Sequence, residues 1–259
     1  MVQLIAYQSK DQGAAFVAEH IAEKINEFQP TESKPFVLGL PTGSSPEPVY
    51  KHLVELYNDK KVSFKNVVTF NMDEYCGLEP SNDQSYHYFM YKNLFNHIDI
   101  QEKNIHILNG LADDFEKECQ SYQEEIAKYA PFQIFMGGVG AKGHIAFNEV
   151  GSARDSQTRK VELEESTINA NSRFFNDDLS KVPRYALSVG ISTVLDNSKE
   201  VITLVFGSSK AQILNKTLNS PISSDIPSTF LRDHKNSLIV CDSEACAELP
   251  ESAVEISKL

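Results

Sequence analysis

Three short segments hold residue types that could carry chemistry, and each directly follows an apolar run. The longest is Gly137 to Glu149, where four glycines fall within seven residues and His144 follows at once. The glycines, Gly138 among them, let the backbone approach a ligand closely and offer N–H donors. A histidine with a nearby carboxylate, here Glu149, is typical of a general acid or base with an orienting partner. The alternative is a loop with an exposed histidine.

The second segment, Asn71 to Tyr75, places two adjacent carboxylates where an apolar strand is expected to end. A partly desolvated aspartate such as Asp73 has a raised pKa, which lets it accept and return a proton in catalysis. The alternative is a solvated acidic turn. The part that Glu74 plays stays open, because adjacent carboxylates can be partners or bystanders.

The third segment runs from Thr42 to Pro46, between an expected strand and an expected helix. Gly43 permits a tight turn, Ser44 or Ser45 can cap the helix, and Pro46 suits its first turn. Free N–H groups and hydroxyls at such a helix start can bind an anion, although an ordinary capped junction is equally compatible. The segment is not a Walker A loop, because no Gly-Lys-Ser/Thr follows.

Two cations could complete an anion site. Arg173 lies among aromatic residues in Asn171 to Phe175, and Lys210 follows an apolar run at Gly207 to Lys210. If both converge on the segment from Thr42, they form a phosphate clamp. Otherwise each is a solvated charge.

The elements that must position these residues alternate along the chain. Apolar runs predict strands at Phe36–Leu40, Val67–Phe70, Ile105–Leu108, Phe132–Met136, Tyr185–Val189, Val201–Phe206 and Ser237–Cys241. Amphipathic stretches predict helices at Phe16–Phe28, Val49–Leu56, Tyr86–Phe95 and Phe115–Tyr129. This alternation predicts an α/β fold with an open, mostly parallel, Rossmann-like sheet and helices on both faces. In such sheets, ligands bind at the carboxyl ends of the strands. We expect a single domain over residues 1–259, with the polar segment 150–183 as a lid-like, mobile insertion.

Composition excludes several classes of protein. The chain has 259 residues and 24 basic against 36 acidic side chains, a net charge of −12, which opposes nucleic acid as the main partner. No apolar run approaches the ~20 residues of a membrane helix, and the first residues lack a signal-peptide layout. The cysteines and histidines are scattered, so no metal site is expected.

The sequence is compatible with both a monomer and a homo-oligomer. We expect a cytoplasmic protein; the final Ser257-Lys258-Leu259 is a peroxisomal address in eukaryotes and is the alternative.

Together these segments resemble the glucosamine-6-phosphate deaminase family, within a larger group that includes ribose-5-phosphate isomerase and 6-phosphogluconolactonase. The resemblance runs from Phe36 to about Asp242 and is carried by LGLPTGSSP, VVTFNMDEY, QSYHYFMY, NIHILNG, GHIAFNE and NSRFF. NMDEY with GHIAFNE is the most specific combination. The related lactonases share a Gly-His loop but lack the Phe-Asn-Glu that follows it.

The resemblance implies that glucosamine 6-phosphate and water are converted to fructose 6-phosphate and ammonia, with no metal or organic cofactor. By position, His144 would open the sugar ring, oriented by Glu149, and Asp73 would carry the C2 proton to C1 through an enolamine. Residues of several segments would bind the substrate and its phosphate: Thr42, Gly43, Ser44, Gly138, Arg173 and Lys210. A 6-phosphogluconolactonase-like hydrolase and a catalytically weak sugar-phosphate sensor are the alternatives.

One departure from the family concerns the histidine loop. Relatives usually carry an acidic residue one position before the Gly-His pair, where this chain has Lys142. A cation beside His144 would disfavour the imidazolium form. Either Lys142 points to solvent and Glu149 alone orients His144, or ring opening is impaired. We expect the first.

A second departure concerns regulation. Allosteric relatives bind N-acetylglucosamine 6-phosphate through a Ser-Ser pair and an Arg-x-Lys. Here Ala153 follows Ser152, and Val161 stands where the lysine is expected after Arg159, although Lys160 is one place away. We therefore predict weak or absent activation by that ligand.

Overall fold

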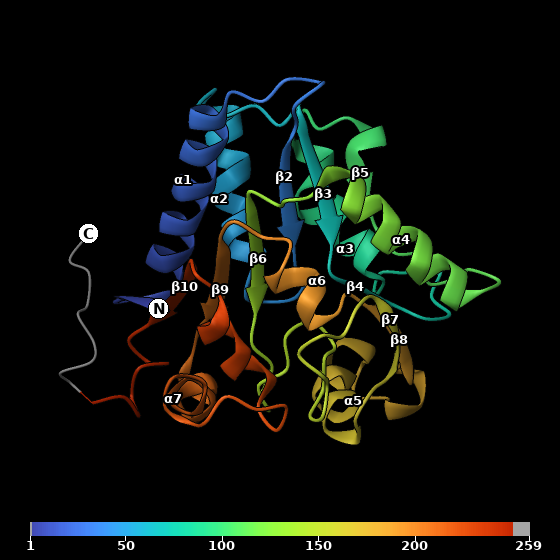
Figure 1. Ribbon diagram of the computed structural model, residues 1–259, viewed down its shortest axis with the longest axis vertical. Helices are drawn as coiled ribbons and strands as arrows, with labels where there is room; N and C mark the ends of the chain where they lie inside the picture. Colours follow the sequence, from blue (N-terminus) through green and yellow to red (C-terminus); the bar gives the residue numbers. More distant parts are fainter. Residues whose placement is uncertain (1, 251–259) are drawn as a thin grey trace.

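Seven parallel strands form the main sheet of the structure, a computed structural model in which residues 2–250 are described (Figure 1). Their spatial order is β1 (Gln3–Tyr7), β10 (Ser237–Asp242), β9 (Val201–Val205), β6 (Ile134–Gly138), β2 (Phe36–Leu40), β3 (Val67–Asn71) and β5 (Ile105–His106). The chain order reverses between the neighbouring strands β2 and β6: β3 and β5 extend to one side, and β9, β10 and β1 to the other. The parallel α/β fold expected from the sequence is therefore confirmed.

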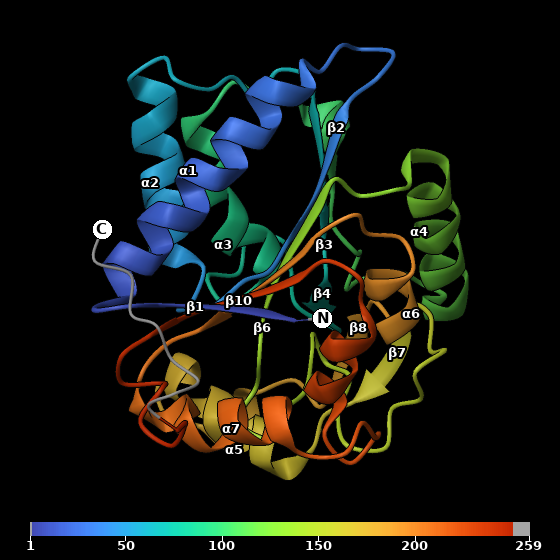
Figure 2. The ribbon, with the colours of Figure 1, turned by 60° about the vertical axis from the view of Figure 1, so that its left-hand side comes forward.

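Helices cover both faces of this sheet, as Figure 2 shows with the strands seen nearly edge-on. One face carries α1 (Lys10–Phe28), α2 (Glu47–Asn58) and α3 (Tyr86–Asn93), and the other carries α4 (Phe115–Tyr129) and α6 (Ile191–Leu195). Successive strand residues point to opposite faces. In β10, Leu238 and Val240 pack in the α1 side of the core, and Ile239 and Cys241 in the α4 side. Burial on both faces explains why such strands are apolar along most of their length.

A second sheet has three antiparallel strands in the order β4 (Asp73–Tyr75), β8 (Tyr185–Ser188) and β7 (Arg159–Glu162). The prediction that Tyr185–Val189 belongs to the main sheet is therefore wrong, since β8 pairs only within this small sheet among the described residues. Because β4 begins two residues after β3 ends, the chain that carries Asp73 passes directly from one sheet to the other.

Several boundaries also differ from those predicted. Gly137 and Gly138 are the last residues of β6 rather than part of the following loop. Helix α1 begins earlier than its apolar pattern, because Ser9 caps it and the Gln12 side-chain oxygen accepts a hydrogen bond from the Ser9 N–H. The strand expected at Ile105–Leu108 is reduced to the two residues of β5.

Helices α5 (Glu165–Asn171) and α7 (Ala211–Asn219) lie at the end of the sheet toward which β6 runs (Figure 1). The described residues also form short 3-10 helices: Phe95–His97, Glu102–Asn104, Ser172–Phe175, Leu179–Lys181, Ser208–Lys210 and Pro227–Asp233. The segment 150–183 contains β7 and α5, and its apolar side chains form a small core with Tyr75 and Phe147: Leu163, Ile168, Phe175 and Val182. Among residues 2–250, no helix is long and apolar enough to cross a bilayer.

Candidate functional site

A cavity of about 490 Å³ opens where β2 and β6 end, at the reversal of strand order. This is the position at which open parallel sheets bind ligands, because the loops on the two sides diverge there. Segments far apart in the sequence line it. Every residue predicted for the site except Glu149 is among them: Thr42, Gly43, Ser44, Asp73, Gly138, Lys142, His144, Arg173 and Lys210.

Asp73 is the first residue of β4, and its side chain reaches the cavity while only 6% of the residue is exposed. Pairing of β4 with β8 holds its backbone opposite Ser188. No residue between 2 and 250 donates a hydrogen bond to its carboxyl group. Burial, and next the charge of Glu74, raise the pKa of Asp73 well above its usual value. The solvated acidic turn is thereby excluded, and the carboxyl can hold a proton where an exposed aspartate would be ionised.

Glu74, the neighbouring acid, is occupied elsewhere. Its Oε1 accepts hydrogen bonds from the backbone N–H groups of Tyr75 (2.8 Å) and Tyr86 (3.0 Å), and its Oε2 from that of His87 (2.9 Å). Burial raises the pKa of Glu74, and these hydrogen bonds oppose that shift. Because Tyr86 and His87 begin α3, the carboxylate satisfies N–H groups that a helix start leaves unpaired. Glu74 therefore anchors α3 beside the cavity.

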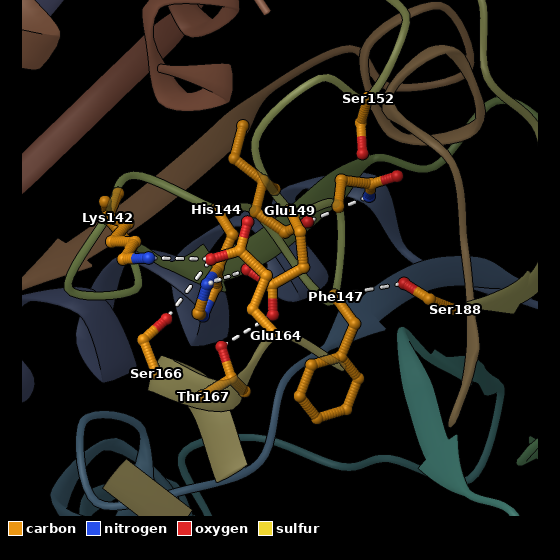
Figure 3. A network of polar contacts seen from close by, with 12 residues as sticks. Lys142, His144, Phe147, Glu149, Ser152, Glu164, Ser166, Thr167 and Ser188 are labelled. Atoms are coloured by element: carbon orange, nitrogen blue, oxygen red, sulfur yellow. Dashed lines mark hydrogen bonds and ion pairs between the residues drawn. The ribbon is translucent and has the colours of Figure 1, made fainter. Parts of the chain in front are cut away.

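His144 lies in the loop after β6, and its Nδ1 is 3.1 Å from Oε2 of Glu149 (Figure 3). The other carboxylate oxygen of Glu149 accepts a hydrogen bond from the Thr167 hydroxyl at 2.6 Å. Burial works against ionisation of Glu149, but hydrogen bonds from His144, Thr167 and the Glu164 backbone outweigh it, and the pKa of Glu149 is lowered. An ionised Glu149 thus holds the ring by Nδ1. A Cβ atom at Gly140 would stand 1.9 Å from Nε2, so only glycine leaves room for this ring position.

Lys142 forms an ion pair with a carboxylate of another segment. Its Nζ lies 2.8 Å from Oε2 of Glu164, and about half of the lysine side chain (52%) is exposed (Figure 3). Among the described residues, Glu149 is the one carboxylate that hydrogen-bonds to His144. Glu149 thus orients the imidazole as the first sequence-based alternative expects, but the lysine pairs with Glu164 and lines the cavity instead of pointing free into solvent. That ring opening is unimpaired stays a prediction.

The loop after β2 differs from the capped junction considered for it. Helix α2 has Pro46 at its N-cap and no side chain bonds to its first turn, so the prediction that Ser44 or Ser45 caps the helix is wrong. Pro46 already has helical backbone angles, which leaves no extended position for a capping serine. The hydroxyls of Thr42, Ser44 and Ser45 hydrogen-bond to no residue within 2–250, and all three residues line the cavity.

Two cations line the same cavity as this loop. Lys210 donates from Nζ to the carbonyl of Val139 at 2.7 Å, and burial, followed by the charge of Arg173, lowers the pKa of Lys210. The two side chains are therefore close enough to repel each other, and an anion between them would relieve that repulsion. A third cation, Lys10, donates to the carbonyl of Ser44 at 2.6 Å and also lines the cavity. Its place at the start of a surface helix offered no sequence signal.

Several lining residues were not identified from the sequence. Asn171 donates to the Tyr75 hydroxyl at 2.8 Å, and the ring of Tyr86 stacks on that of Phe147. Asn171 and Tyr75 belong to motifs singled out for other residues, whereas Thr167 lies in a stretch without a pattern. No group of three or more His, Cys, Asp or Glu side chains within residues 2–250 is placed to hold a metal ion.

The region considered for effector binding is engaged within the chain. The Arg159 guanidinium donates to Oδ1 of Asn148 (2.8 Å) and to the hydroxyl of Ser152 (3.1 Å). The ammonium of Lys160 lies over the ring of Tyr185, 4.4 Å from its centroid. Weak activation stays a prediction.

The fold and the site define a class of α/β protein with a ligand cavity at the β2–β6 reversal, and comparison with known families agrees. The model of the family "Glucosamine-6-phosphate isomerases/6-phosphogluconolactonase" matches residues 8–240. The chain belongs to this family.

Within this family, the chain is most usefully compared with three proteins named for glucosamine 6-phosphate and with one lactonase. The chain is 57% identical over 240 residues to the glucosamine-6-phosphate isomerase of Candida albicans, covering 92% of this chain and 95% of that protein. It is 52% identical over 254 residues to the glucosamine-6-phosphate deaminase of Pasteurella multocida, covering 98% and 95%. The solved structure of a monomeric glucosamine-6-phosphate deaminase superposes with a TM-score of 0.90 at 36% identity, covering 95% of this chain and 99% of that one. A 6-phosphogluconolactonase from Thermotoga maritima, 21% identical with a TM-score of 0.73, shares the fold.

Proposed function

We propose that the protein converts glucosamine 6-phosphate and water into fructose 6-phosphate and ammonia. The observation that carries the proposal is that buried Asp73 shares one cavity with His144 and with the cations Arg173 and Lys210. Moving a proton between adjoining carbons needs an acid that can be both base and donor, and a sugar phosphate needs an anion site. The relatives that are 52% and 57% identical carry the names of enzymes for this substrate.

The phosphate group would bind between the loop after β2 and the paired cations. Thr42 and Ser44 offer hydroxyls that no described residue uses, and Gly43 has a backbone conformation (φ +101°) in which a Cβ would be strained. A phosphate dianion beside Lys210 and Arg173 would favour the charged form of the lysine. Gly138, at the end of β6, lines the cavity without a side chain to fill it.

His144 is placed to open the sugar ring. Glu149 holds Nδ1, which leaves Nε2 to take the proton of the anomeric hydroxyl and return it to the ring oxygen. The resulting imidazolium would be stabilised by the ionised carboxylate behind it. This step gives the open-chain aldehyde.

Asp73 would then act on the open chain. Its carboxylate takes the proton from C2 while the aldehyde oxygen gains a proton from the substrate ammonium, which forms an enolamine; the carboxyl group then returns the C2 proton to C1. The C2 imine that results is hydrolysed by water, which releases ammonia and leaves the ketone of fructose 6-phosphate. The raised pKa of Asp73 suits both halves of this transfer, because it makes the carboxylate a stronger base than an exposed aspartate and leaves a carboxyl group that can still donate the proton.

The direct test is to incubate the chain with glucosamine 6-phosphate and to measure ammonia and fructose 6-phosphate in parallel. We expect equal amounts of both products, and neither from a chain carrying Asp73→Asn. Glucose 6-phosphate, which lacks the amino group, is the control for ammonia from other sources. Tight calorimetric binding of glucosamine 6-phosphate without ammonia would establish the sensor instead. Hydrolysis of 6-phosphogluconolactone without ammonia release would establish the lactonase.

We also propose that residues 150–183 act as a lid and that the protein works in the cytoplasm. The lid is supported by the lining residues that α5 and the following turn supply, among them Thr167, Asn171 and Arg173. Proteolysis within this segment should slow when a sugar phosphate is bound, and an unchanged rate would count against a lid. The peroxisomal alternative depends on Ser257-Lys258-Leu259, which lies outside the described residues.

A further inference from the structure

An ion pair links the two chain segments that hold the imidazole in place (Figure 3). Oε2 of Glu164 accepts a hydrogen bond from Lys142 Nζ at 2.8 Å and another from the Ser166 hydroxyl at 3.2 Å. Lys142 lies in the loop after β6, two residues before His144, whereas Glu164 is the N-cap residue of α5. The pair therefore joins the loop that carries the imidazole to the segment 150–183.

The first turn of α5 also holds Glu149. One carboxylate oxygen receives the Thr167 hydroxyl at 2.6 Å, and the backbone of Glu164 forms a further hydrogen bond with this carboxylate. The remaining contact is Nδ1 of His144 at 3.1 Å. The position of the group that orients the imidazole is thus set from α5, so a shift of α5 would move Glu149 relative to the ring.

We propose that the Lys142–Glu164 ion pair is a positioning element for ring opening, which keeps α5 against the His144 loop and so keeps Glu149 in line with Nδ1. The inference rests on the proposed function, because ring opening is the step assigned to His144. Neither member of the pair touches the reacting atoms; both act through Glu149. Two hydrogen bonds to Glu149, from the Thr167 hydroxyl and the Glu164 backbone, also join the loop to α5. The ion pair therefore adjusts the position of α5 and does not create it.

The size of the effect follows from exposure. The lysine side chain is 52% exposed and the glutamate side chain 30%, which places the pair among surface ion pairs of modest strength. We therefore expect a loss of the pair to lower kcat by about three- to fivefold. The KM for glucosamine 6-phosphate should stay near that of the wild type, because the cations proposed to bind phosphate are not changed.

The test compares Glu164→Gln and Lys142→Met with a matched pair elsewhere. Lys103 and Glu32 form a surface ion pair at 2.6 Å between distant segments, and neither lines the cavity. Lys103→Met and Glu32→Gln should leave kcat unchanged. The double variant Lys142→Glu/Glu164→Lys, which restores a pair with exchanged charges, should recover most of the lost rate.

A second readout separates positioning from general loosening. With substrate deuterated at C2, slower ring opening makes C–H cleavage less rate-limiting, so the isotope effect on kcat should fall toward 1 in Glu164→Gln and Lys142→Met. Melting temperatures are measured for all variants; should Glu164→Gln fail to fold, Lys142→Met and the charge exchange carry the same test.

The inference is overturned if both single variants keep the wild-type kcat, if the control pair loses as much, or if the isotope effect stays at its wild-type value. A wild-type chain that releases no ammonia would instead overturn the proposed function. The two failures are therefore distinguishable.

Discussion

A single substitution, Asp73→Asn, should both stabilise the protein and abolish its turnover. Asp73 is 6% exposed, and its carboxyl group accepts no hydrogen bond from the described residues, so its ionised form is buried without compensation. Asn has nearly the same shape and no charge. Ammonia release should fall by at least about 100-fold, because the C2 proton then has no acceptor.

The stability gain should depend on pH. The pKa of Asp73 is raised in the folded state above the unfolded value of about 3.9, so between these two values the folded state binds more protons. The free energy of unfolding of the wild type therefore falls as pH rises through that interval. Each unit by which the pKa is raised removes up to about 1.4 kcal/mol above both values. We expect Asp73→Asn to gain about 1–3 kcal/mol at a pH above both pKa values, and less as the pH falls toward the unfolded value.

Urea unfolding across this pH range measures the gain, and the adjacent acid supplies the control. Glu74 accepts backbone hydrogen bonds at 2.8, 3.0 and 2.9 Å, so Glu74→Gln turns one acceptor into a donor facing an N–H group. That variant should lose about 1–3 kcal/mol. An Asp73→Asn protein that is less stable than the wild type, or whose gain does not change with pH, would refute the reasoning.

Four further outcomes are expected. Gly140→Ala should lower kcat by about 100-fold with near-normal KM, because the new Cβ would stand 1.9 Å from Nε2 of His144; a wild-type rate would contradict this. Lys210→Met should raise KM for the phosphorylated substrate by about tenfold or more while the melting temperature does not fall, since the lysine is buried with a lowered pKa. Lys142→Asp should lower turnover by about three- to fivefold, because it leaves Glu164 unpaired; a gain of about 100-fold, roughly 2.7 kcal/mol, would show that the lysine impairs ring opening. Substrate saturation should be hyperbolic with and without N-acetylglucosamine 6-phosphate, and a sigmoidal curve that this ligand makes hyperbolic would contradict the prediction of weak activation.

Six of the seven strands of the main sheet were predicted, because a strand buried in the sheet carries its own apolar signal; the edge strand β1 (Gln3–Tyr7), which is partly exposed, was missed. Val201–Val205 is buried throughout and apolar at every position but Thr203, since both faces of β9 are covered, and Val67–Asn71 is buried throughout in the same way. The small sheet carries no such signal. β7 (Arg159–Glu162) alternates exposed charges with half-buried positions, and its strand conformation depends on pairing with β8 from distant sequence.

The residues of the site also differ in how far the sequence predicts them. His144 and Glu149 are five residues apart, so their partnership was visible in the sequence. The partners that set their geometry were not: Thr167 and Glu164 come from a stretch whose helix is short and has no apolar period. The acid that pairs with Lys142 is 22 residues away, and only tertiary structure identifies it.

The different roles of Asp73 and Glu74 follow from the pairing register of β4. Consecutive strand residues point to opposite faces, so two adjacent acids in a strand cannot share an environment. Opposite Ser188 and Leu187, the register sends Asp73 to the cavity and Glu74 to the start of α3. Hydrogen bonds fix that register on both sides, from Val189 N–H to Met72 O (2.8 Å) and from Cys76 N–H to Tyr185 O (3.0 Å). A slip of one residue would exchange the faces, leaving a glutamate in the cavity and α3 without its anchor. Strand pairing therefore decides which of the two acids faces the cavity, which composition and spacing alone could not reveal.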